Sequence, residues 1–504
     1  MLSAPAGGAR QQSEHRGVID LMTPGLIRHL VLGACAVLLP CGGAQSQGAA
    51  PVPPAVSAAM DSIFLPMSHS GEPGCAAGIY QNGAVTFSRG YGFANLTHAV
   101  PITPTTRFTT GSVSKQFTAA SIALLVRAGR ISLDDDVRKY IPEMTAYPTP
   151  VRVRHLVHHT SGLRDFWELV GLSGLRFDDG YTNDDMLAMA ARQRNLNFTP
   201  GAEYRYSNTG YLALAIIVKR VTGQSLRQFA DSAIFRPLGM VHSLFLDDHN
   251  EIVPDRAAAY SPKGRGWEVN IWNNDIIGQG GLVTTIDDLQ KWDENFYSGK
   301  VGGREFIELM QTTEPLNSGA PNRYAFGLNV TTYRGQRLVE HSGATGGYRA
   351  VIARFPDQHT SFAMLCNRST VNTSLLALRM ADVVLQSALG APTPRATPAG
   401  TEEGSARKAG APRPRELTAI VGRYASPELG GAIWEVFADS AAGGALQLRR
   451  PRAPEVPLVP LETAWTYGAG DGVMLTFDAP SRGRAGGFRM DGNRVTNIRF
   501  DRVP

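Results

Sequence analysis

Short runs of alternating hydrophobic and polar residues lie near both ends of the first 390 positions, and longer runs with helical periodicity lie between them. Two strand-like runs flank Asn82-Gly83, a dipeptide typical of a tight hairpin turn. Further strands are predicted at 326–332, 337–340, 349–355 and 361–365, and helices at 112–126, 184–194, 210–221 and 371–389. This order predicts an α+β domain at 47–389 whose terminal strands pair in one antiparallel sheet, flanked by helices.

A change in composition follows this domain. Residues 390–414 are rich in Pro, Gly, Ala and Thr, which predicts a linker. Segment 415–504 then contains short alternating runs separated by turns, which is typical of a small all-β barrel or sandwich. The runs are 420–424, 433–437, 445–449, 473–477, 487–490 and 495–500.

Residues 1–46 are predicted to be an export signal. Arg28 and His29 precede an apolar run at 30–40, and small residues at 42–46 suit a processing site. The run is shorter than the ~20 residues that a membrane span needs, so no span is expected once the signal is removed. We therefore expect a periplasmic or secreted protein.

Two details of this segment stay open. Met22 is a candidate for the true start, because residues 1–21 carry Glu14 and Asp20 and do not resemble the start of a signal. The stretch that ends at Cys35 resembles a lipoprotein processing box. We favour ordinary cleavage, because most of the apolar run follows Cys35.

Composition narrows the class of protein. The 504 residues are 43% hydrophobic and 18% charged, which describes a folded globular chain and excludes wholesale disorder. The net charge of +5 gathers largely in the linker, so no nucleic-acid partner is expected. We expect a small-molecule or peptide substrate, and the sequence does not predict the oligomeric state.

Two cysteines, Cys75 and Cys366, lie beyond the signal segment. Each is next to an apolar, strand-like run. We interpret them as two buried small apolar side chains rather than as a disulfide.

Ser112 and Lys115 open the first predicted long helix. Residues three apart share a helix face, so the Lys115 amine can reach the Ser112 hydroxyl. A lysine acts as a base only when neutral, and burial would have to supply that shift. A second Ser-x-x-Lys, Ser405 to Lys408, lies in the predicted linker, where no helix aligns the pair.

Two further segments carry polar side chains in turn-rich sequence. Tyr206-Ser207-Asn208 precedes a predicted helix, and a Tyr206 phenolate would need a neighbouring cation such as Lys115. Tyr181-Thr182-Asn183 has the same spacing, but Thr182 or Asn183 is interpreted as a helix cap. His341-Ser342-Gly343-Ala344 follows a predicted strand, where glycine lets backbone N–H groups approach a substrate.

The order Ser-x-x-Lys, Tyr-Ser-Asn, His-x-Gly resembles the serine β-lactamase-like hydrolases, which include class C β-lactamases, penicillin-binding carboxypeptidases and D-aminopeptidases. The resemblance covers residues 55–390 and implies a β-lactamase/transpeptidase-like fold with an all-helical subdomain. Segment 415–504 looks like the lipocalin-like domain attached to some of these hydrolases.

The resemblance implies a role for each motif residue. Ser112 would be the acylated nucleophile, and Lys115 and Tyr206 would share the general-base work. Asn208 would hold the substrate amide, and the backbone N–H groups of Ser112 and Ala344 would bind the oxyanion.

One departure changes the expected substrate. Class C β-lactamases have Lys-Thr-Gly where this chain has His341-Ser342-Gly343, so a permanent cation facing the substrate carboxylate is replaced by a mostly neutral group. We therefore expect an exported peptidase or esterase with weak or no β-lactamase activity. The alternative is a non-hydrolytic peptide or cell-wall binding protein that retains the fold.

No cofactor or metal is expected. His155-x-x-His158-His159 lacks the His-Glu-x-x-His spacing of helical zinc sites, and no matching cysteine pair accompanies it.

Overall fold

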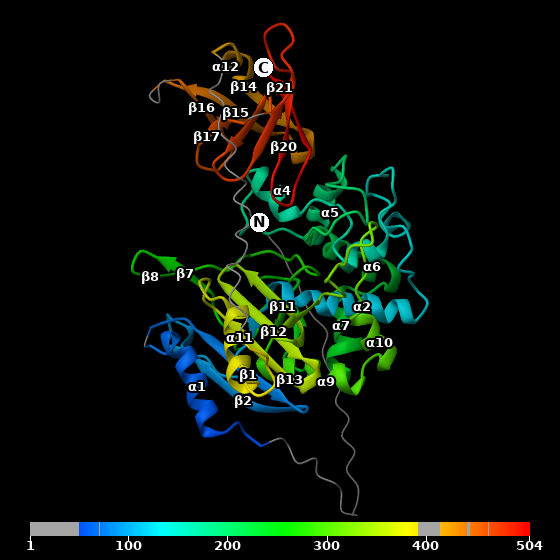
Figure 1. Cartoon of the computed structure of the whole chain (residues 1–504), viewed down its shortest axis with the longest axis vertical. Helices are drawn as coiled ribbons and strands as arrows, with labels where there is room; N and C mark the ends of the chain where they lie inside the picture. The colour runs from blue at the N-terminus through cyan, green and yellow to red at the C-terminus, as the bar shows by residue number, and fades with distance from the viewer. Residues whose placement is uncertain (1–49, 70, 392–413, 441–443, 462) are drawn as a thin grey trace, which may run out of the picture. The chain divides into compact units, whose positions relative to one another are not determined.

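The computed structural model describes residues 50–69, 71–391, 414–440, 444–461 and 463–504. Its central element is a six-stranded antiparallel sheet in the order β10-β11-β12-β13-β1-β2 (Figure 1). β1 (Cys75–Gln81) lies between β2 (Ala84–Tyr91) and β13 (Thr360–Cys366). Early and late strands thus pair in one sheet, and the predicted α+β class is confirmed.

The other elements of this domain have the following bounds. The remaining strands of the central sheet are β10 (Asn329–Tyr333), β11 (Gln336–Thr345) and β12 (Tyr348–Phe355). Short strands elsewhere are β3 (Phe93–Asn95), β4 (Val100–Pro101), β5 (Phe108–Thr109), β6 (Leu244–Phe245), β7 (Tyr260–Lys263), β8 (Gly266–Val269) and β9 (Leu282–Thr284). The helices are α1 (Pro54–Phe64), α2 (Lys115–Arg127), α3 (Val153–Val157), α4 (Phe166–Leu172), α5 (Asn183–Ala191), α6 (Asn208–Thr222), α7 (Leu226–Ala230), α8 (Arg236–Leu238), α9 (Ile286–Ser298), α10 (Gly303–Met310) and α11 (Thr373–Val384).

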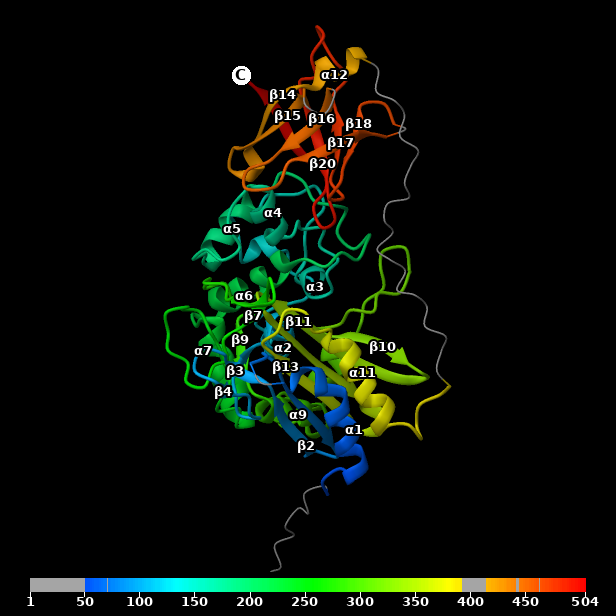
Figure 2. The same cartoon turned by 90° about the vertical axis from the view of Figure 1, so that its left-hand side faces the viewer.

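Both faces of the sheet are covered. Along β1, Ala77 and Ile79 pack into one apolar cluster with α1 and α11, which lie beside each other in Figure 2. Ala76 and Tyr80 point to the opposite face and join the larger core around α2, α6 and α9. The Tyr80 hydroxyl donates a 2.6 Å hydrogen bond to the Ile286 carbonyl and so ties β1 to α9. A strand buried on both faces needs the nearly continuous apolar sequence that β1 has.

The helix predicted at 112–126 begins as a single 3-10 turn, Gly111–Ser114, and continues as α2. α2 is buried on nearly every side by the other helices of the subdomain. The helix ends before Gly129, whose φ of +68° favours glycine, as its place after the apolar run predicts.

The C-terminal domain is a closed antiparallel barrel of eight strands, β14 to β21, preceded by α12 (Pro414–Ile420). This confirms the predicted all-β domain. Two strands, β17 and β18, lie outside the predicted runs. For β17 the reason is that Pro457 and Pro460 make its sequence resemble that of a loop. The strands are β14 (Gly422–Ser426), β15 (Ala432–Asp439), β16 (Ala445–Arg449), β17 (Val456–Pro460), β18 (Thr466–Ala469), β19 (Met474–Phe477), β20 (Gly487–Asp491) and β21 (Ile498–Val503).

A buried ion pair joins the barrel to the helical subdomain. Arg164 and Glu428 are 2.8 Å apart, with side-chain exposures of 0% and 2%. The same guanidinium donates hydrogen bonds to the carbonyls of Thr496 and Asn497. Because a buried guanidinium needs all its donors paired, these contacts fix the barrel against the residues just before α4.

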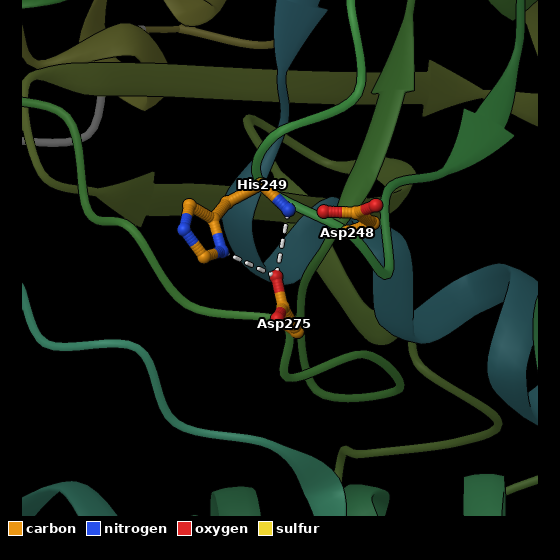
Figure 3. Close-up of side chains that lie close together, drawn as sticks. All are labelled: Asp248, His249 and Asp275. Atoms are coloured by element: carbon orange, nitrogen blue, oxygen red, sulfur yellow. Dashed lines mark hydrogen bonds and ion pairs between the residues drawn. The ribbon is translucent and has the colours of Figure 1, made fainter. Parts of the chain in front are cut away.

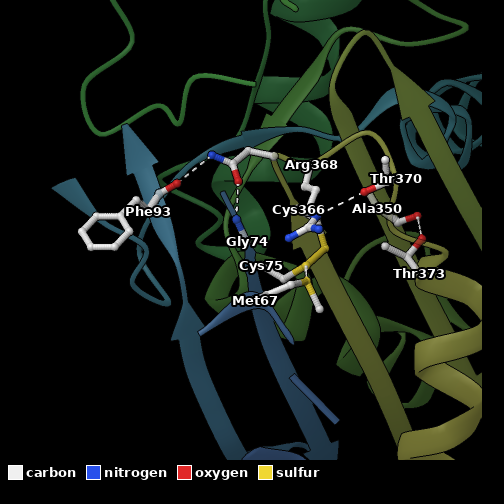
Figure 4. Close-up of a disulfide and its surroundings, with 10 residues drawn as sticks. Met67, Gly74, Cys75, Phe93, Ala350, Cys366, Arg368, Thr370 and Thr373 are labelled. Atoms are coloured by element: carbon white, nitrogen blue, oxygen red, sulfur yellow. Dashed lines mark hydrogen bonds between the residues drawn. A yellow bond between two sulfur atoms is a disulfide. The ribbon is translucent and has the colours of Figure 1, made fainter. Parts of the chain in front are cut away.

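Cys75 and Cys366 form a disulfide, so their interpretation as two separate buried thiols is wrong (Figure 4). They are direct partners in the β1–β13 register, and their Cα atoms are 4.0 Å apart. The sequence concealed the pair because 291 positions separate the two cysteines. Strand register alone brings them together.

Several expectations fall on residues outside the described part of the chain. They are the export signal at 1–46, including Met22 and Cys35, most of the linker at 390–414, and the second Ser-x-x-Lys at Ser405 and Lys408. Among the described residues, every helix is too short or too polar to qualify as a membrane span.

Candidate active site

Ser112 and Lys115 lie together at the start of α2, as their spacing predicts. Lys115 Nζ is 3.1 Å from Ser112 Oγ. The Lys115 side chain is completely buried, whereas Ser112 is half-buried and lines an open cleft of about 870 Å³. The hydroxyl therefore faces substrate space while the amine behind it is shielded from water.

The surroundings of Lys115 favour its neutral form. Burial lowers the pKa of the amine well below its usual value. Its Nζ also lies 2.9 Å from Asn208 Oδ1 and 2.6 Å from the Gln279 carbonyl oxygen. A neutral amine has two N–H donors for these two acceptors, and its lone pair then faces the Ser112 hydroxyl. This is the arrangement that a general base requires.

Tyr206 lies next to this pair, with the centre of its ring 4.8 Å from Lys115 Nζ. Burial raises the pKa of the Tyr206 phenol, although a hydrogen bond with the Ser112 side chain acts in the opposite direction. Lys115 is therefore neutral and Tyr206 is protonated. The sequence had suggested the opposite pairing, a Lys115 ammonium beside a Tyr206 phenolate. Tyr206 is suited to donate a proton and Lys115 to accept one.

Asn208 is held in one orientation by Asp165, a residue that the sequence analysis missed. The Asp165 carboxylate is fully buried and accepts hydrogen bonds from the Asn208 backbone N–H (2.8 Å) and Nδ2 (2.7 Å). Its other oxygen accepts from the Trp167 backbone N–H and caps α4. The Asn208 amide must therefore point its oxygen at Lys115. In the sequence, Asp165 has only the features of a helix cap.

The 341–344 motif lies within β11 rather than after it. β10 pairs only with Gln336–Glu340, so the following segment from His341 to Thr345 has a free edge on that side. Ser342 and Ala344 are exposed along this edge and line the cleft. A free strand edge can bind an extended substrate through backbone hydrogen bonds.

Glycines bring β11 close to the turn that carries Ser112. A Cβ atom on Gly343 would lie 2.8 Å from the Ser112 backbone nitrogen, and one on Gly111 would lie 2.6 Å from the Ala344 nitrogen. Only glycine fits both positions. The close approach packs the turn that carries Ser112 against the part of β11 that carries Ala344, and both residues line the cleft.

His341 lines the cleft with Ser112 and Tyr206, as a substrate-binding residue would, but little of its ring is exposed. Its ring is buried, and its Nδ1 and Nε2 lie 2.6 Å from the Ser342 carbonyl oxygen and 2.8 Å from the Tyr324 hydroxyl. Nδ1 must donate to the carbonyl, so Nε2 accepts from Tyr324. Burial lowers the pKa of His341 to about 3. The ring is therefore neutral and supports the strand rather than offering a cation.

An aromatic wall, defined by Trp167, Phe177 and Trp272, lines another part of the cleft. The ring centres of Trp167 and Trp272 are 5.0 Å apart, and those of Phe177 and Trp272 are 5.9 Å apart. The residues come from distant segments, so no local pattern indicates the wall. It suits an apolar or aromatic substrate group.

The remaining sequence candidates have structural roles. The Thr182 side chain accepts from the Asp185 backbone N–H and caps α5. His159 accepts a hydrogen bond from the Ser207 backbone N–H at Nδ1, and its ring packs 4.2 Å from that of Tyr206. His159 thus supports the loop that carries Tyr206.

Only one group of possible metal ligands occurs among the described residues, namely Asp248, His249 and Asp275 (Figure 3). His249 already uses its backbone N–H (2.7 Å) and Nδ1 (2.9 Å) on Asp275 Oδ1. The group does not include any of the three histidines of the 155–159 segment.

Comparison with known proteins identifies a family for most of the chain. Residues 56–386 match the family model described as Beta-lactamase. A D-aminopeptidase of Gluconobacter oxydans is 28% identical over 64% of this chain and 59% of the relative, so the chain spans less than two thirds of that protein. A D-aminopeptidase of Brucella canis is 27% identical over 78% of this chain and 70% of its own length.

A solved structure, that of the octameric penicillin-binding protein homologue from Pyrococcus abyssi, matches with a TM-score of 0.58 and 27% identity. It covers 88% of this chain and 99% of that one. The family model spans the sheet, α2 and all three motifs. Ser112 and Lys115 lie in contact in the matched region with Tyr206 beside them, and the chain belongs to the Beta-lactamase family.

Proposed function

We propose that this protein hydrolyses D-aminoacyl amides or short D-amino-acid peptides through an acyl-enzyme at Ser112. The observation that carries the proposal is the contact between Ser112 Oγ and a buried Lys115 amine, whose other two acceptors are already in place. The D-aminopeptidase relatives support the class of substrate.

The geometry supports the following sequence of steps. Lys115 accepts the Ser112 proton as Oγ attacks the substrate carbonyl carbon. The resulting oxyanion binds the backbone N–H groups of Ser112 and Ala344. Tyr206 donates its proton to the leaving nitrogen when the carbon–nitrogen bond breaks, and the Lys115 ammonium restores that proton. Water then attacks the acyl-enzyme, releasing the acid and Ser112.

The neutral His341 ring bears on which amides fit. A β-lactam or a peptide with a free carboxylate would gain no cation from this position. The aromatic wall instead suits a substrate with an apolar group. We propose efficient turnover of D-aminoacyl amides with apolar side chains, and weak or no β-lactam hydrolysis.

Export is part of the proposal. The Cys75–Cys366 disulfide fits an oxidising compartment, where structural disulfides persist, and residues 1–46 have the composition of a signal. Fractionation of the native host, with N-terminal sequencing of the mature protein, tests this part.

A matched set of p-nitroanilides tests the activity. We expect D-phenylalanine and D-leucine p-nitroanilides to be cleaved, and their L-enantiomers to be cleaved at least ~10-fold more slowly, because one acyl geometry fits the oxyanion hole. A fluorophosphonate should label the wild type but not Ser112→Ala. Equal labelling of both would overturn the Ser112 assignment, whereas labelling without cleavage of any D-anilide would overturn the substrate class. Noncovalent binding with no labelling would instead support a non-hydrolytic peptide-binding protein.

A further inference from the structure

The connection between β20 and β21 of the barrel reaches the catalytic residues. Arg494, in this connection, lines the same cleft as Ser112 and Tyr206. Its guanidinium carbon is 5.0 Å from the centre of the Tyr206 ring. One guanidinium nitrogen is 3.9 Å from Asp165 Oδ2. A residue of the C-terminal domain therefore lies beside the proposed base and its supports.

The backbone of this connection, and not the Arg494 side chain, fixes its place. The Arg494 N–H donates a 2.8 Å hydrogen bond to Glu168 Oε2, and its carbonyl accepts from Asn197 Nδ2 at 2.9 Å. The Thr496 N–H donates to Asn197 Oδ1 at 2.8 Å. Replacing the Arg494 side chain leaves these contacts available. The guanidinium is thus dispensable for docking and is available for another role.

Asp165 connects this guanidinium to Lys115. Its carboxylate is fully buried and holds the Asn208 amide, whose oxygen is 2.9 Å from Lys115 Nζ. A buried negative charge so near an amine favours the ammonium, which cannot act as a base. The site therefore needs a positive charge that offsets Asp165 without contacting Ser112. Arg494 has that position.

We propose that the barrel takes part in catalysis through Arg494, a positioning residue that balances the charge of Asp165 and so keeps Lys115 in its basic, neutral form. This inference rests on the proposed role of Lys115 as the general base. It goes beyond that role because it makes a second domain part of the hydrolase site.

The other charged and titratable groups around Lys115 do not replace Arg494. They are Tyr206 and Tyr211, whose ring centres lie 4.8 and 5.5 Å from the amine, the rings of His159 and His341, and the carboxylate of Asp165. Burial keeps both histidines neutral and both phenols protonated. Burial is also the main cause that lowers the pKa of Lys115, whereas Asp165 raises it and Arg494 lowers it.

The test uses the full-length chain and measures how the rate of Ser112 labelling by a fluorophosphonate depends on pH. In Arg494→Gln we expect the midpoint of the acidic limb of the pH profile to move to higher pH by about 0.5 to 1 unit. The reason is that the variant loses the positive charge that offsets Asp165. Arg494→Lys keeps the charge and should stay close to the wild type. Asp165→Asn should move the limb in the opposite direction. Arg484→Gln removes an exposed barrel arginine and serves as the control.

Opposite shifts in the Arg494 and Asp165 variants would support the proposal, since loss of packing alone moves rates but not the two limbs in opposite directions. Coincident profiles for Arg494→Gln and the wild type would overturn it. The proposal would also be overturned if Arg494→Gln and Arg494→Lys lowered the labelling rate equally and left the midpoint of the acidic limb unchanged.

A second measurement needs no activity. The chain has seven lysines, at 115, 139, 219, 263, 291, 300 and 408, so selective 13Cε-lysine labelling gives few NMR signals, and Lys115→Arg assigns the one of interest. Its titration midpoint should rise in Arg494→Gln and fall in Asp165→Asn. If fluorophosphonate fails to label the wild type, the proposed function fails, and this titration alone decides the role of Arg494. An unchanged midpoint would overturn it.

Discussion

A Cβ atom placed on Gly343 would lie 1.9 Å from the carbonyl oxygen of Thr110. No side chain fits at that distance, so the approach of β11 to the turn before α2 depends on this glycine. The turn carries Ser112 and the strand carries Ala344. The contact between Gly343 and Thr110 thus sets the spacing of the two proposed oxyanion donors.

Gly343→Ala should therefore impair acylation and also lower stability, because the added Cβ would meet backbone atoms of the turn before α2. We expect kcat/KM to fall about 100-fold or more, because an oxyanion donor displaced by a fraction of an ångström loses most of its effect. Gly266→Ala, at a strand position with open space around it, is the control. The measurement is kcat/KM on a D-aminoacyl p-nitroanilide together with the midpoint of urea unfolding. Wild-type activity in Gly343→Ala would contradict the assigned oxyanion hole.

Lys115→Arg tests the need for a neutral amine. Arginine cannot lose its proton, so the variant keeps a cation but has no base. We expect the rate of Ser112 labelling to fall by about 10² to 10⁴ at every pH. Lys139→Arg, an exposed lysine paired with Asp135, should label at the wild-type rate. A labelling rate for Lys115→Arg that recovers at alkaline pH would assign the base to another group.

His341 should make stability depend on pH. Its pKa is about 3 in the folded state, against about 6.5 in the unfolded chain, so the unfolded chain binds the proton first as pH falls. The contribution of the neutral His341 ring to stability is complete above about pH 6.5 and is lost as the pH falls from there to about 3. At pH 5 the loss is about 2 kcal/mol, from 1.36 kcal/mol per pH unit.

His341→Gln keeps an acceptor for Tyr324 and removes this titration. Urea unfolding at pH 7.5 and pH 5 should show a smaller decline for His341→Gln than for the wild type. His69→Gln, at an exposed position, should decline as the wild type does. An unchanged decline in His341→Gln would show that the ring is protonated in the folded state.

Local sequence patterns predicted the parts of the site that depend on short spacing. Ser112 and Lys115 lie one helical turn apart, and that spacing alone places the amine by the hydroxyl. Tyr206 and Asn208 are two positions apart where a loop joins the start of α6, so their relative placement is also set by short sequence spacing. The six-stranded sheet was predictable in outline because apolar strands at both ends of a domain need a common partner.

Parts of the site built from distant segments were not predictable. Asp165 resembles an ordinary helix cap until the fold places Asn208 against it. Arg494 is one of many arginines in the chain, and only the docking of the barrel brings it to Tyr206. The disulfide was not predictable for the same reason, because the register of β1 and β13 decides which cysteines lie opposite each other. Sequence spacing carries no information about such contacts.

Loss of the disulfide should destabilise the chain and spare the site. Cys75→Ala/Cys366→Ala is expected to lower the free energy of unfolding by about 2 to 5 kcal/mol, because the unfolded chain regains the freedom of a long loop. Thermal unfolding with and without reductant measures this. Reductant should lower the Tm of the wild type but not that of the double variant. A wild type that reacts fully with a thiol reagent after denaturation without reductant would show that the pair is not bonded.

Arg164 and Glu428 should hold the barrel to the helical subdomain. Either Arg164→Met or Glu428→Leu leaves one buried charge unpaired, with an expected cost of about 3 to 5 kcal/mol in the free energy of unfolding. The double variant removes both charges and should recover part of that loss, although the carbonyls of Thr496 and Asn497 then lack their donor.

A double-mutant cycle in urea separates the pair from its surroundings. Arg449→Met and Glu435→Leu, an exposed pair within the barrel, form the matched control and should couple by less than about 1 kcal/mol. Arg164→Met and Glu428→Leu should each also lower activity, because Arg494 reaches the cleft only while the barrel is docked. Coupling near zero between Arg164 and Glu428 would mean that other contacts hold the barrel. Full activity in an undocked variant would show that the hydrolase domain works without it.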